Sequence, residues 1–274
     1  MLISANLCIV HLLTSNVAEV LLLCVGLAFQ DRESFSVFPL APLQILWINM
    51  ITSSFPAFGL GLEKASSDIM RRPPRKGSVF SKEILIDMLV YGTIMGGCCL
   101  ISFVVIVYGV GDGELGTRCN QTYSEQCDSV FRARACIFAE LTWLILISAV
   151  EFKSVRRSIF RLDHYQTESR FPLFKDHWEN NFLLFSVVIG ALSVFIPIYA
   201  PTINTNVFKQ KGISWEWALA VGSVIVFVFN VEVWKFVKRY IGLFNGGESD
   251  RVPKNLDLSF RQGFFTLSRT MTKG

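Results

Sequence analysis

Long apolar stretches alternate with short charged connections along this chain, and six of the stretches are long enough to cross a bilayer. Three of them carry no charge at all: residues 34–62, 88–111 and 180–208. A hydrocarbon core takes about 20 helical residues. We therefore predict an all-α, polytopic membrane helix bundle with six transmembrane helices, at residues 5–29, 39–62, 84–109, 131–152, 181–200 and 214–240. The fourth is the weakest by hydropathy, because Glu140 and Glu151 interrupt it.

Polar side chains stand near the middle of the first two predicted spans. Asn16 and Glu19 are spaced i, i+3, and Asn49, Thr52 and Ser53 are spaced i, i+3, i+4, so each set shares one helix face. An ionisable group at mid-membrane costs roughly 2.5–3.5 kcal/mol, so such groups normally pair with each other or line an ion path. We predict a cation site between these faces. The alternative is a protonated or hydrogen-bonded carboxyl with interhelical hydrogen bonds.

Two further glutamates lie in the fourth predicted span. Glu151 is close to Lys153 and Arg156 in sequence, so it is either a further cation ligand or one half of an interfacial ion pair. Glu140 is eleven residues earlier and about 20° around the same face. We expect Glu140 to have a structural or vestibule role near the outer side.

The charge pattern predicts the orientation. With the N-terminus inside, the inner connections 63–87 and 152–180 and the tail after 232 hold 20 of the 26 Lys and Arg residues. Cytoplasmic loops are rich in these residues, so both termini are predicted to be cytoplasmic. The net charge of +4 is then explained by contact with the lipid bilayer and indicates no nucleic-acid partner. We divide the chain into a transmembrane domain, 1–242, and a cytoplasmic tail, 243–274.

An outer connection carries two cysteines and a glycosylation sequon. Cys119 and Cys127 lie in the 109–130 loop, and Asn120 begins the only Asn-x-Ser/Thr sequence in the chain. These residues are candidates for a disulfide and for a glycan; the alternative is two free cysteines in a surface loop. Within the spans, small residues spaced four apart predict close helix packing, at Gly92 and Gly96, Ser186 and Gly190, and Ala218 and Gly222.

Three segments of the chain resemble parts of the P-type cation ATPases. Residues 42–52 (PLQILWINMIT), followed by 68–75 (DIMRRPPR), resemble their sixth membrane helix and the loop after it, and 13–20 (LTSNVAEV) resembles their fifth helix. The resemblance covers essentially the whole chain as membrane helices five to ten. Residues 58–64 (FGLGLEK), the 119–127 loop and 158–161 (SIFR) are most similar to the sodium (ENA-type) pumps of fungi.

The resemblance implies which residues bind the cation. In calcium-pump relatives the matching ligands are Asn16 and Glu19 on the fifth helix, Asn49 and Thr52 on the sixth, and Glu151 on the eighth. An Asp of the sixth helix is Ser53 here. Since Ca²⁺ takes 6–8 oxygens and favours several carboxylates, the loss of this carboxylate favours a monovalent cation, Na⁺ or K⁺.

The resemblance also implies what the chain lacks. The phosphorylation motif DKTGT of the family is absent. We expect this chain to be the C-terminal transmembrane half of a P-type Na⁺ (or K⁺) exporting ATPase. Alone, this half should hydrolyse no ATP and hold no cofactor. For the reactions of ATP and Mg²⁺ it depends on the missing N-terminal part of the pump. The plasma membrane is the expected location, with the endoplasmic reticulum as the alternative. The alternative functions are the same half of a Ca²⁺-transporting ATPase, and a stand-alone six-span protein that acts as a channel or as a regulatory partner.

Overall fold

The structure is a computed structural model, and it describes residues 2–61, 82–113, 115–152 and 181–241. The predicted tail, 243–274, lies outside these residues. Within the described ranges every regular element is helical, apart from an isolated bridge between Gln30 and Ser36. The predicted all-α fold is confirmed.

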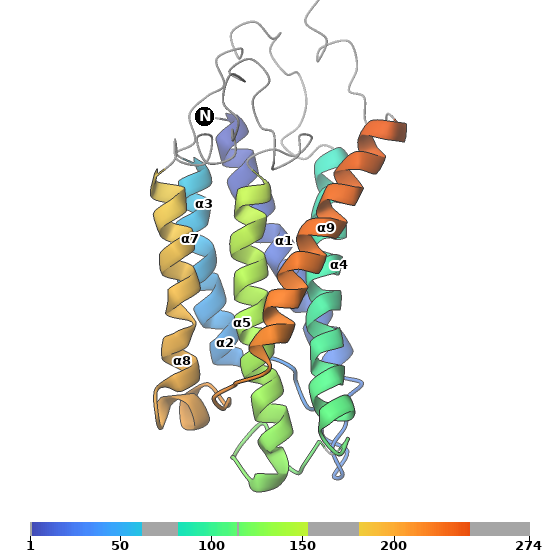
Figure 1. Cartoon of the computed structure of the whole chain (residues 1–274), viewed down its shortest axis with the longest axis vertical. Coiled ribbons are helices and arrows are strands. Elements are labelled where there is room, and N and C mark those ends of the chain that lie inside the picture. Colours follow the sequence, from blue (N-terminus) through green and yellow to red (C-terminus); the bar gives the residue numbers. More distant parts are fainter. Residues whose placement is uncertain (1, 62–81, 114, 153–180, 242–274) are drawn as a thin grey trace, which may run out of the picture.

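Six of these helical segments are long and apolar enough to span a membrane, which confirms the predicted number of spans (Figure 1). The first is α1 (Leu2–Gly26). The second joins α2 (Pro42–Trp47), the π-helix η1 (Ile48–Ser53) and α3 (Ser54–Gly61). The third joins α4 (Lys82–Val104) and η3 (Val105–Val110), and the fourth joins η4 (Glu125–Cys127) and α5 (Asp128–Glu151). The fifth joins α7 (Asn181–Ser193) and α8 (Phe195–Tyr199), followed by η5 (Ile203–Val207), and the sixth is α9 (Trp217–Ile241).

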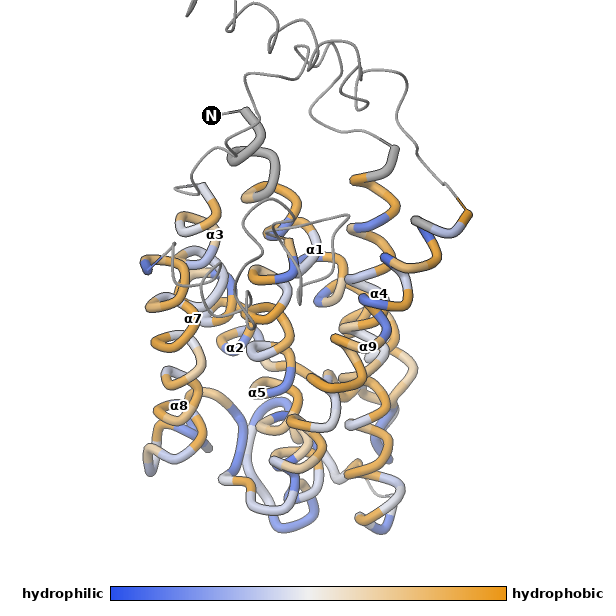
Figure 2. Tube along the Cα trace, turned by 45° about the horizontal axis from the view of Figure 1, so that its top comes forward, coloured by the Kyte–Doolittle hydropathy of each residue, from blue (hydrophilic) through white to orange (hydrophobic). Residues whose placement is uncertain are grey.

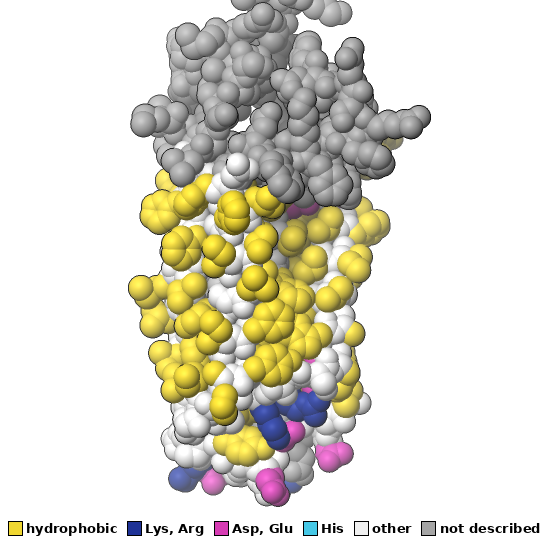
Figure 3. All heavy atoms as spheres, turned by 60° about the vertical axis from the view of Figure 1, so that its left-hand side comes forward, with side chains coloured by type: hydrophobic (Ala, Val, Ile, Leu, Met, Phe, Trp, Pro, Cys, Tyr) yellow, Lys and Arg dark blue, Asp and Glu magenta, His cyan; other side chains and the backbone are white. Residues whose placement is uncertain are grey.

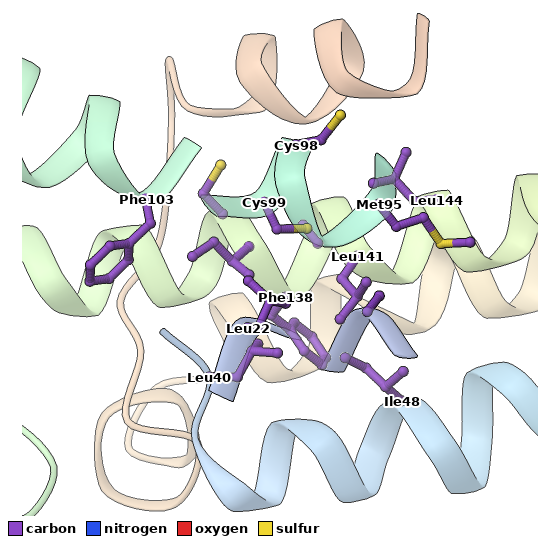
Figure 4. Packing of buried hydrophobic residues seen from close by; sticks show 14 of the residues in the cluster. Leu22, Leu40, Ile48, Met95, Cys98, Cys99, Phe103, Phe138, Leu141 and Leu144 are labelled. Carbon is purple, nitrogen blue, oxygen red and sulfur yellow. The ribbon is translucent and has the colours of Figure 1, made fainter. Parts of the chain in front are cut away.

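Helix α5 is the centre of the bundle and packs against α1, α3, α4, α7 and α9 (Figure 1). Its spanning segment is 83% buried inside the protein, against 17% for that of α9. The prediction that this span has the weakest hydropathy is wrong, because its mean hydropathy is 1.7 and that of Pro42–Gly61 is 1.2. The polar side chains of α5 are buried against the neighbouring helices. Figure 4 shows the apolar packing around it, with Phe138 and Leu141 of α5 beside Leu22 of α1 and Ile48 of η1.

Two of the three predicted small-residue contacts are present. A side chain at Gly92 of α4 would meet Val17 of α1 at 2.6 Å, and one at Gly190 of α7 would meet Leu146 of α5 at 2.8 Å. At Gly222 of α9 no atom of the described residues lies within 4 Å of that position. The motif at Ala218 and Gly222 therefore makes no close helix contact within the described bundle, because α9 lies at the periphery of the bundle.

The bundle has two distinct ends. Helix α1 begins where α5 and α9 end, which we call the terminal end; the loop end carries the connections 27–41, 111–127 and 200–216 (Figure 1). Hydrophobic residues dominate the helices between the ends (Figure 2), and on the face drawn in Figure 3 charged side chains gather at the loop end. Large apolar side chains on this surface, such as Phe185 and Phe229, are about two-thirds exposed. Lipid contact explains such a surface. Which end faces the cytoplasm stays a prediction.

Candidate cation site

The second span changes its helix type at the predicted polar residues. Between α2 and α3 the backbone forms the π-helix η1, which contains Asn49, Thr52 and Ser53. Short π-helical turns are rare and frequently lie at functional sites. Pro56 follows in α3 and, having no N–H, cannot donate to a carbonyl of the turn before it. The interruption at Pro56 is visible in the sequence, but the π-helix before it was not predicted.

One hydrogen bond joins the two predicted polar faces. Asn49 Nδ2 of η1 donates to Glu19 Oε2 of α1 over 2.8 Å. Glu19 is 5% exposed, and its other oxygen, Oε1, has no hydrogen-bond partner among the described residues. The structure thus brings Glu19 and Asn49 together inside the bundle and leaves one carboxylate oxygen unused.

Thr52 and Ser53 are fully buried in the same π segment. The Thr52 hydroxyl donates to Ile48 O at 2.7 Å, which leaves its oxygen able to accept or to coordinate. The Ser53 hydroxyl is buried without a hydrogen-bond partner in the described part of the chain. An unsatisfied buried polar atom costs about 1–3 kcal/mol, so these oxygens need another interaction. A dehydrated cation would supply one.

Asn16 occupies a different environment. It lies one turn from Glu19 on α1, yet its side chain is exposed on the described bundle, whereas Glu19 is buried. The shared helix face therefore crosses the edge of the bundle between these two residues. Asn16 as a ligand stays a prediction.

Glu151 is placed far from Glu19. Its carboxylate forms an ion pair with Lys235 of α9. His11 of α1 lies beside Ser148 of α5, with Nδ1 and Oγ 3.3 Å apart, and fixes the relative depth of the two helices. At 1.5 Å per residue Glu19 lies about 12 Å from this level toward the loop end, and Glu151 about 4 Å toward the terminal end. The two carboxylates are thus separated by about 16 Å along the bundle.

Glu140 is a second carboxylate, buried near the middle of α5. Its side chain is fully buried, and Ser102 and Cys99 of α4 and Ser223 of α9 lie around it. Neither oxygen has a hydrogen-bond partner of good geometry among the described residues. Complete burial contradicts a role in a vestibule; a structural role remains the prediction for this residue.

At the loop end the structure joins Cys119 and Cys127 in a disulfide, with their Cα atoms 5.5 Å apart. Asn120 is exposed; its Nδ2 donates to Ser36 O at 2.7 Å, and its Oδ1 accepts from Arg134. A glycan on Asn120 stays a prediction. The burial of Arg134 was not predicted. From the sequence it is one of the six Lys and Arg residues assigned to the outer side, but in the structure it is only 1% exposed.

The donor set at η1 limits the chemistry of the site. No group of three or more His, Cys, Asp or Glu side chains that could hold a metal ion occurs in the described residues. Glu19 contacts η1 through Asn49, and η1 itself offers only neutral amide and hydroxyl oxygens, which together make a hard, weakly charged ligand set. Such a set suits an alkali cation better than a transition metal or Ca²⁺.

Comparison with known proteins identifies the family. The family described as "Cation transporting ATPase, C-terminus" matches residues 37–237. The chain belongs to this family. The cation-transporting ATPases that it is similar to include "Sodium/potassium exporting P-type ATPase cta3" of Schizosaccharomyces pombe, 47% identical over 235 residues, which are 84% of this chain and 23% of the relative. "Sodium/potassium exporting P-type ATPase 1" of Saccharomyces cerevisiae is 45% identical over 234 residues, 84% of this chain and 21% of the relative. "Calcium-transporting ATPase 1" of Bacillus cereus is 28% identical over 238 residues, 84% of this chain and 24% of the relative.

The chain spans less than a quarter of the length of each of these ATPases. Its six spans are the C-terminal membrane region of a P-type ATPase, as the resemblance implied. The first and second spans, which meet through Glu19 and Asn49, carry all the predicted cation ligands except Glu151, which lies on the fourth span.

Proposed function

We propose that this region forms part of the intramembrane cation path of a P-type ATPase that exports Na⁺, with K⁺ as a second substrate. The observation that carries the proposal is the buried Glu19–Asn49 pair at a π-helical turn, with Glu19 Oε1 and Ser53 Oγ left without partners. A charged group inside a membrane bundle is expensive unless it has a partner or a function. A partly dehydrated cation at these oxygens provides the missing partner.

The charge of the site favours a monovalent cation. The segment η1 contains no charged residue, Glu19 of α1 is the carboxylate bonded to it, and Asn49, Thr52 and Ser53 supply neutral oxygens. One negative charge balances one Na⁺ or K⁺ but only half of one Ca²⁺. The higher identity to the sodium/potassium-exporting relatives than to the calcium-transporting one points the same way.

The energy for transport would come from the rest of the pump. This chain has no DKTGT motif, so ATP and Mg²⁺ would act on the N-terminal part, and phosphoryl transfer there would alter helix tilt and ligand geometry at η1. Asn16, exposed on the described bundle, would then face the other helices of the pump and complete the ligand set. We place the region, 1–242, in the plasma membrane, with both termini and the 243–274 tail in the cytoplasm.

The test uses a complete pump in which residues 2–241 replace the corresponding region of the Schizosaccharomyces pombe relative; we call it the grafted pump. Glu19→Gln should raise the Na⁺ concentration for half-maximal ATPase activity at least tenfold, because it removes the charge that balances the ion. Glu33→Gln is the matched control, since Glu33 is exposed and pairs with exposed Arg118 at the loop end. Equal Na⁺ dependence of both variants would refute the proposal. Stimulation by Ca²⁺ rather than Na⁺ would establish the calcium alternative.

A further inference from the structure

Lys235 of the last helix is buried against Glu151, which was predicted from the sequence as a cation ligand. Lys235 Nζ of α9 binds Glu151 Oε2 of α5, and both side chains are 0% exposed. Glu232, one turn earlier on α9, lies 3.6 Å from the same ammonium group. A lysine that deep inside a membrane protein requires a carboxylate partner, and Glu151 supplies it.

A second buried pair holds the same end of α9. Lys238 Nζ lies 2.6 Å from Asp87 Oδ2 of α4, and Trp234 Nε1 donates to Asp87 Oδ1 at 2.7 Å. Lys238 and Asp87 are 4% and 1% exposed. Helix α9 is otherwise the least buried span, so these two pairs fix it to α4 and α5 at the terminal end.

The face of α5 that carries Glu151 is turned toward α9. Eleven residues bring a helix back to within about 20° of the same face, so Glu140 and Glu151 point the same way. Glu140 has Ser223 of α9 beside it, and Glu151 has Lys235, twelve residues further along α9, which runs parallel to α5. Glu151 is therefore on the α9 side of α5, as well as about 16 Å from Glu19 along the bundle.

We infer that the ammonium group of Lys235 takes the place of a cation at Glu151, so that Glu151 binds no transported ion. The inference rests on the proposed function, because it concerns the cation path of the same pump. A tethered ammonium is always present beside the carboxylate, so a dissolved cation would have to displace it. This region then contributes one carboxylate, Glu19, to the cation site. Lys235 is thus a residue that sets how many ions the region can hold.

The test compares removal of one partner with removal of both. In the 274-residue chain, purified in detergent, Glu151→Gln and Lys235→Met should each lower the midpoint of thermal unfolding by at least 5 °C. Either change leaves a buried group without its partner. The double variant, E151Q/K235M, should recover most of that loss. Single variants that unfold at the parent temperature, or a double variant no better than the worse single one, would overturn the pairing.

The functional arm uses the grafted pump. E151Q/K235M should keep the Na⁺ concentration for half-maximal ATPase activity within threefold of the parent. If Glu151 bound a transported ion, the double variant would lose Na⁺ activation at least tenfold although it folds, and that result would overturn the inference.

The Na⁺ activation of the Glu19→Gln grafted pump, measured beside that of E151Q/K235M, separates the two proposals. If E19Q has no effect on Na⁺ activation, the proposed function fails, while the unfolding temperatures still decide the Glu151–Lys235 pairing, because those measurements do not involve Glu19.

Discussion

Replacing Arg134 by Met should destabilise the loop end more than any surface change there. The guanidinium group of Arg134 donates to Phe38 O and Cys119 O, each at 2.9 Å, and to Asn120 Oδ1. It also lies 5.7 Å from the centre of the Phe131 ring. Through these contacts one side chain of α5 holds together the 27–41 connection and the disulfide loop.

The size of the effect follows from the three hydrogen bonds. A hydrogen bond to a charged group contributes about 1.5–3 kcal/mol. The three share one donor group and are not additive, and Met retains the contact with Phe131, so we expect a loss of about 3–5 kcal/mol in the free energy of unfolding. At roughly 2–4 °C per kcal/mol for a chain of this size, the unfolding midpoint should fall by about 6 °C or more.

The assay is thermal unfolding of the purified chain in detergent, followed with a thiol-reactive fluorophore. Cys98, Cys99 and Cys136 are buried and unpaired, so they react only when the bundle opens. Arg118→Met is the matched control, because Arg118 is 62% exposed and its ion pair with Glu33 should contribute less than about 1 kcal/mol. If R134M and R118M unfolded within 2 °C of each other, the reasoning from burial and hydrogen bonds would be wrong.

Two further predictions concern helix packing and pH. Gly92→Ala should lower the unfolding midpoint clearly and Gly222→Ala should not, since the added methyl group meets Val17 at 2.6 Å in the first case and open space in the second; equal effects would contradict the packing of α4 on α1. Partial burial disfavours the charged form of Asp31, but hydrogen bonds from the backbone N–H groups of Phe35, Arg118 and Glu33 outweigh it, so the pKa of Asp31 lies below its usual value. A carboxylate with a lowered folded-state pKa stabilises the fold above its unfolded pKa of about 3.9, and this contribution is lost as the pH falls below that value. Asp31→Asn should therefore lower the unfolding midpoint more at pH 6 than at pH 3, and a difference independent of pH would refute this role.

The sequence by itself determined the number of spans, the all-helical fold and the position of polar residues near the middle of the first two spans. These follow from local properties: the length of an apolar stretch that crosses a bilayer, and the helical repeat that places Asn49, Thr52 and Ser53 on one face. The family likewise followed from contiguous segments such as 42–52, whose residues need no tertiary context to be compared.

Only the tertiary structure decided which polar residues meet. Asn16 and Glu19 share a face by spacing, yet one is exposed and the other buried, because the edge of the bundle passes between them. Glu151 has Lys153 and Arg156 near it in sequence, but its partner is Lys235, 84 residues away on α9. Spacing along one helix fixes angle and height on that helix alone, whereas the rotation and depth of its neighbours depend on how all six spans pack together.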